Sequence, residues 1–219
     1  MKYCVLLTLF ILSVSMQAQH LKFSTGTNFT EYDYESTANP SELNLRRGQG
    51  SFYAFGFTHA IGTSRAFAYE LGAVVNEFNA LGGNQLNIYS WKTAYLGLNA
   101  GLSIALINSE SGFKTNLNVG LSGNTLLNGQ QSTNGFPNDL KNQDDFSGMF
   151  LEMAAGLSIS HPISDKADIG IGYRYGTLNQ TGGENSETLT FLNHQLQFSL
   201  HFKLINNEKE STDPTVPAE

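Results

Sequence analysis

The segment LQFSLHFKL, residues 196–204, narrows the fold to two classes. Apolar and polar residues alternate through it: Leu196, Phe198, Leu200, Phe202 and Leu204 against Gln197, Ser199, His201 and Lys203. Successive side chains of a β-strand point to opposite faces, so one face is apolar and the other polar. The apolar face either packs on a protein core, with the polar face in water, or meets lipid, with the polar face inside a barrel.

The first 18 residues predict a signal peptide. Lys2 precedes an apolar run at residues 4–14, which is too short to cross a bilayer as a helix, and Ala18 offers a small residue for cleavage. A retained anchor is the alternative. The single cysteine, Cys4, lies inside this segment. The exported chain would therefore have no disulfide, and its stability must come from its sheet or core.

Two-residue periodicity recurs along the rest of the chain, and no long segment has a helical period. We predict eight strands, an even number as in bacterial outer-membrane barrels, at residues 20–30, 50–60, 66–78, 86–106, 112–124, 147–161, 167–178 and 188–204. Only 14% of the residues are charged. The net charge of −7 argues against a nucleic-acid partner.

The predicted connections alternate in length. Short ones fall at residues 61–65, 107–111 and 162–166, and longer or more polar ones at 31–49, 79–85, 125–146 and 179–187. If both termini lie in the periplasm, every short connection is periplasmic and every longer one extracellular, as in outer-membrane barrels. A soluble sandwich has no reason to sort its loops in this way. The pattern favours an all-β fold, a membrane up-and-down antiparallel β-barrel of about eight strands, over a secreted β-sandwich or a soluble barrel.

The chain resembles the small outer-membrane β-barrel proteins of Gram-negative bacteria, and in particular the porin-like barrel family of Bacteroidota. The resemblance rests on the strand layout from His20 to Leu204, on the signal ending MQAQ, and on hairpins such as LSISHPISDKADIGIGYRYG. Such barrels often end in an aromatic residue, whereas here a polar tail follows Phe202. The barrel would occupy residues 19–205, and residues 206–219 would be a disordered periplasmic tail.

This resemblance implies a location in the cell outer membrane. The implied partners are outer-membrane lipids and lipopolysaccharide, the barrel-assembly machinery and, as one alternative, another outer-membrane protein.

Charged residues on the inward parity predict a network inside the lumen. Its members are Lys22, Glu70, Lys114, Glu152, Arg174, His201 and Lys203. An unpaired buried charge is very costly, so acids and bases should pair there. A barrel of about eight strands is just wide enough for side chains. A charge-paired plug is therefore favoured over a gated ion path.

Aromatic residues predict two girdles at the membrane interfaces. The extracellular girdle would contain Tyr53, Phe78, Tyr89, Trp91 and Tyr175. The periplasmic girdle would contain Phe23, Phe67, Phe113 and Phe202. A sugar-binding platform is the competing interpretation.

The sequence offers little for catalysis or for a cofactor. The five histidines are His20, His59, His161, His194 and His201, and none falls in a predicted extracellular loop. Asp139, Asp144 and Asp145 match no calcium-loop spacing and indicate a solvated loop. We therefore expect a non-enzymatic protein without cofactor or metal. It would have a closed or narrow polar lumen and act as a surface scaffold or binding protein through its extracellular loops. The alternatives are a channel for small or hydrophobic solutes, a subunit of a secretion or assembly complex, and a lipid A-modifying enzyme.

Overall fold

The computed structural model describes residues 20–36, 45–62, 66–83, 87–141, 143–181 and 187–204. The predicted signal peptide and C-terminal tail lie outside these residues. The elements are β1 (His20–Ser36), β2 (Arg46–Ile61), β3 (Phe67–Gly83), β4 (Ile88–Asn108), β5 (Lys114–Thr133), β6 (Phe136–Asp139), α2 (Asp144–Ser147), β7 (Met149–Ser164), β8 (Ala167–Thr181) and β9 (Glu187–Lys203).

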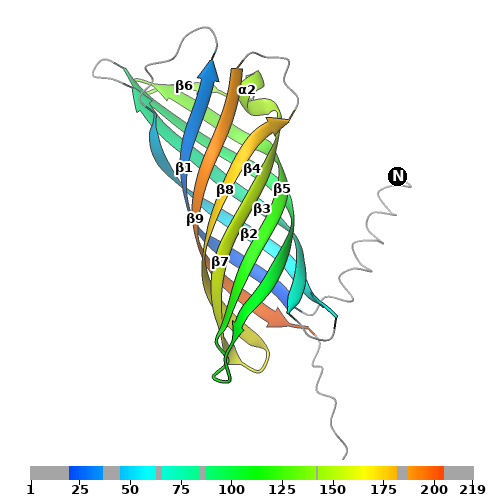
Figure 1. Ribbon diagram of the computed structural model, residues 1–219. Helices are drawn as coiled ribbons and strands as arrows, with labels where there is room; N and C mark the ends of the chain where they lie inside the picture. The colour runs from blue at the N-terminus through cyan, green and yellow to red at the C-terminus, as the bar shows by residue number, and fades with distance from the viewer. Residues whose placement is uncertain are drawn as a thin grey trace, which may run out of the picture.

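The strands form one closed antiparallel barrel (Figure 1). Eight of the nine strands follow one another around it, and β9 pairs with β1 to close the sheet. The ninth, β6, is a short strand that pairs with residues 130–133 at the end of β5, past the part of β5 that pairs with β7. The predicted antiparallel barrel of eight strands is confirmed.

The two ends of the barrel differ. One end, here called the turn end, carries the tight β4–β5 and β7–β8 turns together with the start of β1 and the end of β9 (Figure 1). The other end, here called the extended end, carries β6 and α2.

The strands at the extended end are longer than predicted. β1 continues to Ser36, β3 to Gly83 and β5 to Thr133, so the barrel strands contain 15 to 21 residues. About 9–11 residues suffice for a tilted strand to cross a bilayer. The prediction that residues 31–49, 79–85, 125–146 and 179–187 are loops was therefore wrong for much of their length, because the wall continues into them.

The alternation of side chains inverts where the strands extend. Phe78 and Ala80 of β3 point inward and are fully buried, while Glu77 and Asn79, which alternate with them, lie on the outer wall. On β4, Trp91 points inward and Lys92 outward. Toward the turn end the opposite holds, with apolar side chains outside. The inversion shows that the outer wall suits water at the extended end and suits an apolar medium elsewhere.

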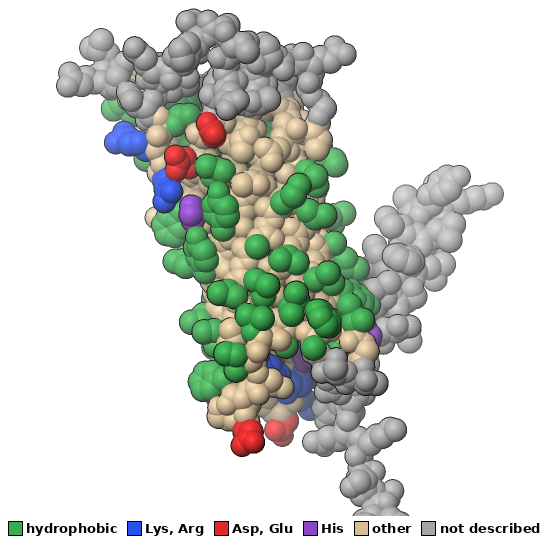
Figure 2. Space-filling view, viewed as in Figure 1, with side chains coloured by type: hydrophobic (Ala, Val, Ile, Leu, Met, Phe, Trp, Pro, Cys, Tyr) green, Lys and Arg blue, Asp and Glu red, His purple; other side chains and the backbone are tan. Residues whose placement is uncertain are grey.

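Apolar side chains cover the outer wall below the extended end, as Figure 2 shows for one face. Exposed examples come from every barrel strand: Phe23, Phe55, Phe67, Leu98, Leu121, Met153, Ile171 and Leu196. An exposed apolar surface of this extent is typical of a membrane or interaction surface. No helix in the described residues is long and apolar enough to cross a membrane.

Candidate functional site: the barrel lumen

Ion pairs occupy the lumen near the turn end. The Nζ atom of Lys22 lies 2.8 Å from Oε2 of Glu70. Asp168 is buried between two bases, with Lys114 Nζ 3.5 Å from its Oδ2 and Lys203 Nζ 3.5 Å from its Oδ1. Each of these carboxylates has a basic partner, as the cost of burying an isolated charge requires.

The sequence prediction named both lysines but missed Asp168. Asp168 stands on the same parity as Arg174, which is predicted to point inward, so the period of two also places Asp168 in the lumen. His201, also predicted in the network, lies with Nε2 3.0 Å from the Ser199 hydroxyl.

The Lys22–Glu70 pair joins strands that are not neighbours. Lys22 of β1 stands opposite Gly56 of β2, and Gly56 stands opposite Gly72 of β3. Because neither glycine has a side chain, Lys22 can reach past β2 to Glu70 on β3.

The most buried charge in the lumen is Glu152, whose side chain is 2% exposed. Its Oε2 atom accepts a hydrogen bond of 2.7 Å from the Ser122 hydroxyl and lies 3.5 Å from Nη2 of Arg174. A Cβ atom on Gly176 would lie 2.8 Å from Oε1 of Glu152. The inward glycine of β8 therefore makes room for the carboxylate.

A layer of amides lies next along the barrel axis. The Asn28 Oδ1 atom accepts hydrogen bonds from Gln195 Nε2 at 2.8 Å and from Asn193 Nδ2 at 3.3 Å. Its Nδ2 group donates to Oδ1 of Asn76 and to the Glu77 carbonyl. All four amide side chains are buried. A fully paired polar network of this kind fixes one arrangement of the surrounding strands.

An aromatic core fills the lumen at the extended end. Its buried members are Tyr32, Phe78, Ala80, Trp91, Tyr95, Leu140, Phe146, Phe150, Leu178, Leu189 and Phe191. The β6–β7 connection supplies Leu140 and Phe146, and Tyr95 donates a hydrogen bond to the Phe146 carbonyl. This cluster is here called the aromatic core.

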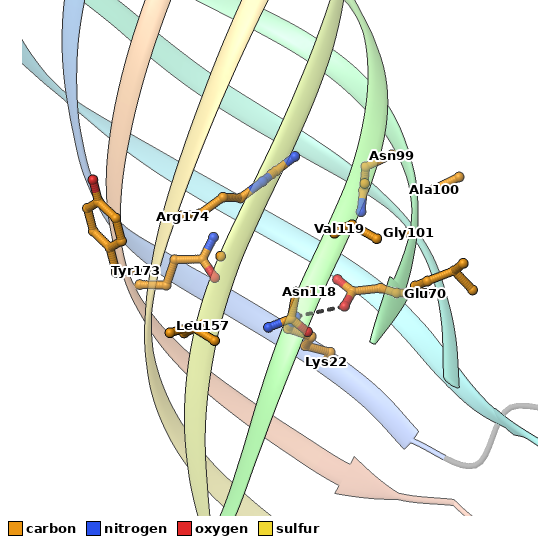
Figure 3. A pocket seen from close by; sticks show the side chains of 14 residues that line it. Lys22, Glu70, Asn99, Ala100, Gly101, Asn118, Val119, Leu157, Tyr173 and Arg174 are labelled. Atoms are coloured by element: carbon orange, nitrogen blue, oxygen red, sulfur yellow. Dashed lines mark hydrogen bonds and ion pairs between the residues drawn. The ribbon is translucent and has the colours of Figure 1, made fainter. Parts of the chain in front are cut away.

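A small cavity remains among the charged residues (Figure 3). Its volume is about 70 Å³, and its polar lining includes Lys22, Glu70, Asn99, Asn118 and Arg174. The Oδ1 atom of Asn99 is buried without a hydrogen-bond partner. A polar cavity of this size has room for a few water molecules, which need polar partners of this kind.

The aromatic girdle prediction was partly wrong. Phe78 and Trp91 are buried in the aromatic core, and Tyr89 packs against it. Each stands on the inward parity of its strand, so the same alternation that identified the strands excludes all three from a lipid-facing belt. The remaining predicted residues are exposed on the outer wall: Tyr53, Tyr175, Phe23, Phe67, Phe113 and Phe202.

Sequence reasoning also missed a polar aromatic group on the outer wall. The Tyr173 hydroxyl lies 2.6 Å from Nδ1 of His194, and the Tyr175 ring centroid is 5.0 Å from that of His194. Amphipathic rings of this kind suit a membrane–water boundary.

Comparison with known proteins establishes the barrel fold and no activity. No protein-family model and no curated protein matches the sequence. The chain is similar to the outer membrane protein OprG from Pseudomonas aeruginosa, at 12% identity over 87% of this chain and 98% of OprG, with a TM-score of 0.51.

Two other structures are similar at lower scores. Neisserial surface protein A has 13% identity over 84% of this chain and 96% of its own, with a TM-score of 0.44. Ail, the attachment invasion locus protein of Yersinia pestis, has 12% identity over 83% and 99%, with a TM-score of 0.35. The finer resemblance to the Bacteroidota porin-like family gains no support from a family model.

Proposed function

We propose that the protein is a non-enzymatic β-barrel of the outer membrane with a closed lumen, and that its extracellular end serves as a surface scaffold or binding platform. The apolar outer wall would contact outer-membrane lipids and lipopolysaccharide, and the barrel-assembly machinery would insert the chain. The turn end would face the periplasm, because the start of β1 and the end of β9 both lie there. The extended end would then stand outside the cell.

The observation that carries the closed lumen is the aromatic core. Phe78, Phe150 and Phe191 are fully buried in it, and the amide layer beneath it is hydrogen-bonded. A solute passing along the axis would have to displace both. The cavity near the turn end is consistent with a polar chamber that does not continue along the whole barrel axis.

Conductance tests this proposal directly. Purified protein reconstituted in a planar bilayer should give no current steps above those of a protein-free bilayer, since the aromatic core blocks the axis. Stable ohmic steps that scale with protein concentration would favour the alternative, a small-solute channel.

Detergent resistance tests the membrane assignment. In an isolated outer-membrane fraction, unboiled protein should migrate differently on an SDS gel from boiled protein, because a closed hydrogen-bonded barrel resists the detergent until heated. A protein found in the soluble fraction, without a heat-dependent shift, would mean that the apolar outer wall packs on protein.

A further inference from the structure

One face of the sheet continues past the aromatic core at the extended end. Tyr89 of β4 stands opposite Thr133 of β5, which stands opposite Phe136 of β6. In the next row, Trp91 stands opposite Gln131, and Gln131 opposite Asn138. Directly opposed residues share a face of a sheet. Since Trp91 is buried in the aromatic core, both rows lie on the inward face.

The upper part of this surface, here called the β4–β6 face, consists of Tyr89, Gln131, Thr133, Phe136 and Asn138. Phe136 is 79% exposed, the most exposed large apolar side chain in the described part of the chain. Asn138 is also exposed, and the other three are partly so. The face thus offers solvent one bare aromatic ring, a half-covered tyrosine, and amide and hydroxyl groups between them.

Hydrogen bonds hold the hairpin turn that precedes Phe136. Asn134 and Gly135 have φ values of 52° and 89°, the two left-handed positions of a tight hairpin turn. The Asn134 side chain accepts a hydrogen bond from the Ile88 backbone N–H and donates one to Asn87, and its own N–H donates to the Ile88 carbonyl. A ring carried on a backbone that is already ordered can bind a ligand without the entropy cost of ordering a loop.

The chemistry of the face is uncharged. None of its five residues carries a charge, and Asp139 is on the opposite parity, with Oδ1 accepting a hydrogen bond from the Lys141 N–H. A sugar ring has one face of C–H groups, which pack on the electron-rich face of an aromatic ring, and a rim of hydroxyls, which exchange hydrogen bonds with amides. We propose that the β4–β6 face binds a neutral oligosaccharide. This inference rests on the proposed function, which places the face outside the cell.

Trp91 supplies the test. It is the only tryptophan of the chain, and its ring stacks with that of Tyr89 at a centroid distance of 5.9 Å. Folded protein in detergent would be titrated with neutral oligosaccharides of glucose, galactose, mannose and their N-acetyl derivatives, from bacterial surface polysaccharides and from host glycans. At least one neutral sugar should change the Trp91 emission saturably. Whether the bacterial or the host set binds identifies the source.

Variants of Phe136 and a matched control distinguish a specific sugar site from a general effect of substitution at this end of the barrel. Phe136→Ser should weaken binding by about tenfold, the order of one aromatic contact, while Phe136→Tyr should retain it. Ile88→Ser is the matched control, because Ile88 is exposed at the same end but on the outward parity. A heat-dependent gel shift would show that each variant is folded.

Two outcomes would overturn the inference: no neutral sugar binds the wild-type protein, or Phe136→Ser and Ile88→Ser bind alike. Binding only to sulfated or carboxylated sugars would also overturn it. Conductance distinguishes this failure from that of the proposed function, because a missing sugar site leaves the barrel closed, whereas current steps refute the closed lumen whatever binds at the face.

Discussion

Phe191→Ala should lower the free energy of unfolding by about 3–5 kcal/mol, the usual cost of truncating a buried phenylalanine. Phe191 is fully buried at the centre of the aromatic core. Its ring centroid lies 4.5 Å from that of Tyr32 and 5.0 Å from that of Phe150, with which it stacks. The hydrogen-bonded sheet surrounds the lumen on all sides, so the strands cannot move inward to fill the cavity left by the phenyl ring. The loss of unfolding free energy should therefore lie toward the upper part of that range.

Urea unfolding from lipid vesicles, followed by Trp91 emission, measures this loss. The matched control is Phe198→Ala, on the same strand but on the outer wall, where Phe198 is 42% exposed. Lipid can fill the space left on the outer wall, so the control should lose less than half as much. Equal losses for the two variants would mean that the aromatic core is loosely packed and does not close the lumen.

The barrel could be predicted from the sequence because its signal is repeated. The alternation in Leu196–Leu204 recurs in seven other segments. Together with the alternating loop lengths, this repetition favours a membrane barrel over a sandwich whose strands pack on a protein core. The length of the strands could not be predicted in the same way. At the extended end the outward residues become polar and the inward ones apolar, so a search for apolar residues on one parity stops where the parity changes.

Two residues indicate in the sequence that apolar side chains move from the outward to the inward parity. Phe52 and Phe150 stand on the parity that is otherwise polar, and both are buried in the lumen. Taken as inward aromatics, they indicate a core inside the barrel rather than irregular strands. The same parity places Phe78 and Trp91 in that core instead of in a girdle.

The partners of the charged lumen residues could not be predicted from the sequence. Parity predicts which side chains enter the lumen, but not the height at which each one stands, because height depends on strand tilt and register. Lys22 and Glu70 meet across Gly56, and Asp168 meets both Lys114 and Lys203. These partners follow from the register of the closed sheet, which the sequence does not display.

Arg174→Met should destabilise the barrel by about 3–5 kcal/mol, because removing one partner of a buried pair leaves an uncompensated charge. The uncompensated charge is that of Glu152, whose side chain is 2% exposed. Of its two polar partners in the described part of the barrel, only the Ser122 hydroxyl would remain. Glu152→Gln should cost less, since an amide keeps a hydrogen-bonding group at that place and leaves Arg174, which is 22% exposed, partly hydrated. Urea unfolding of the three proteins at neutral pH gives the comparison.

Two further variants decide what the loss means. Arg47→Met removes an exposed pair, Arg47 Nε to Glu31 Oε2 at 3.0 Å, and should cost at most about 1 kcal/mol. The double variant Arg174→Met with Glu152→Leu removes both charges, so it should recover much of the stability lost by Arg174→Met alone. If the double variant is no more stable than the single one, the cost is lost packing of the arginine stem. If Arg174→Met unfolds like the wild-type protein, water reaches Glu152, and the cavity that Arg174 lines is a hydrated chamber rather than part of a charge-paired plug.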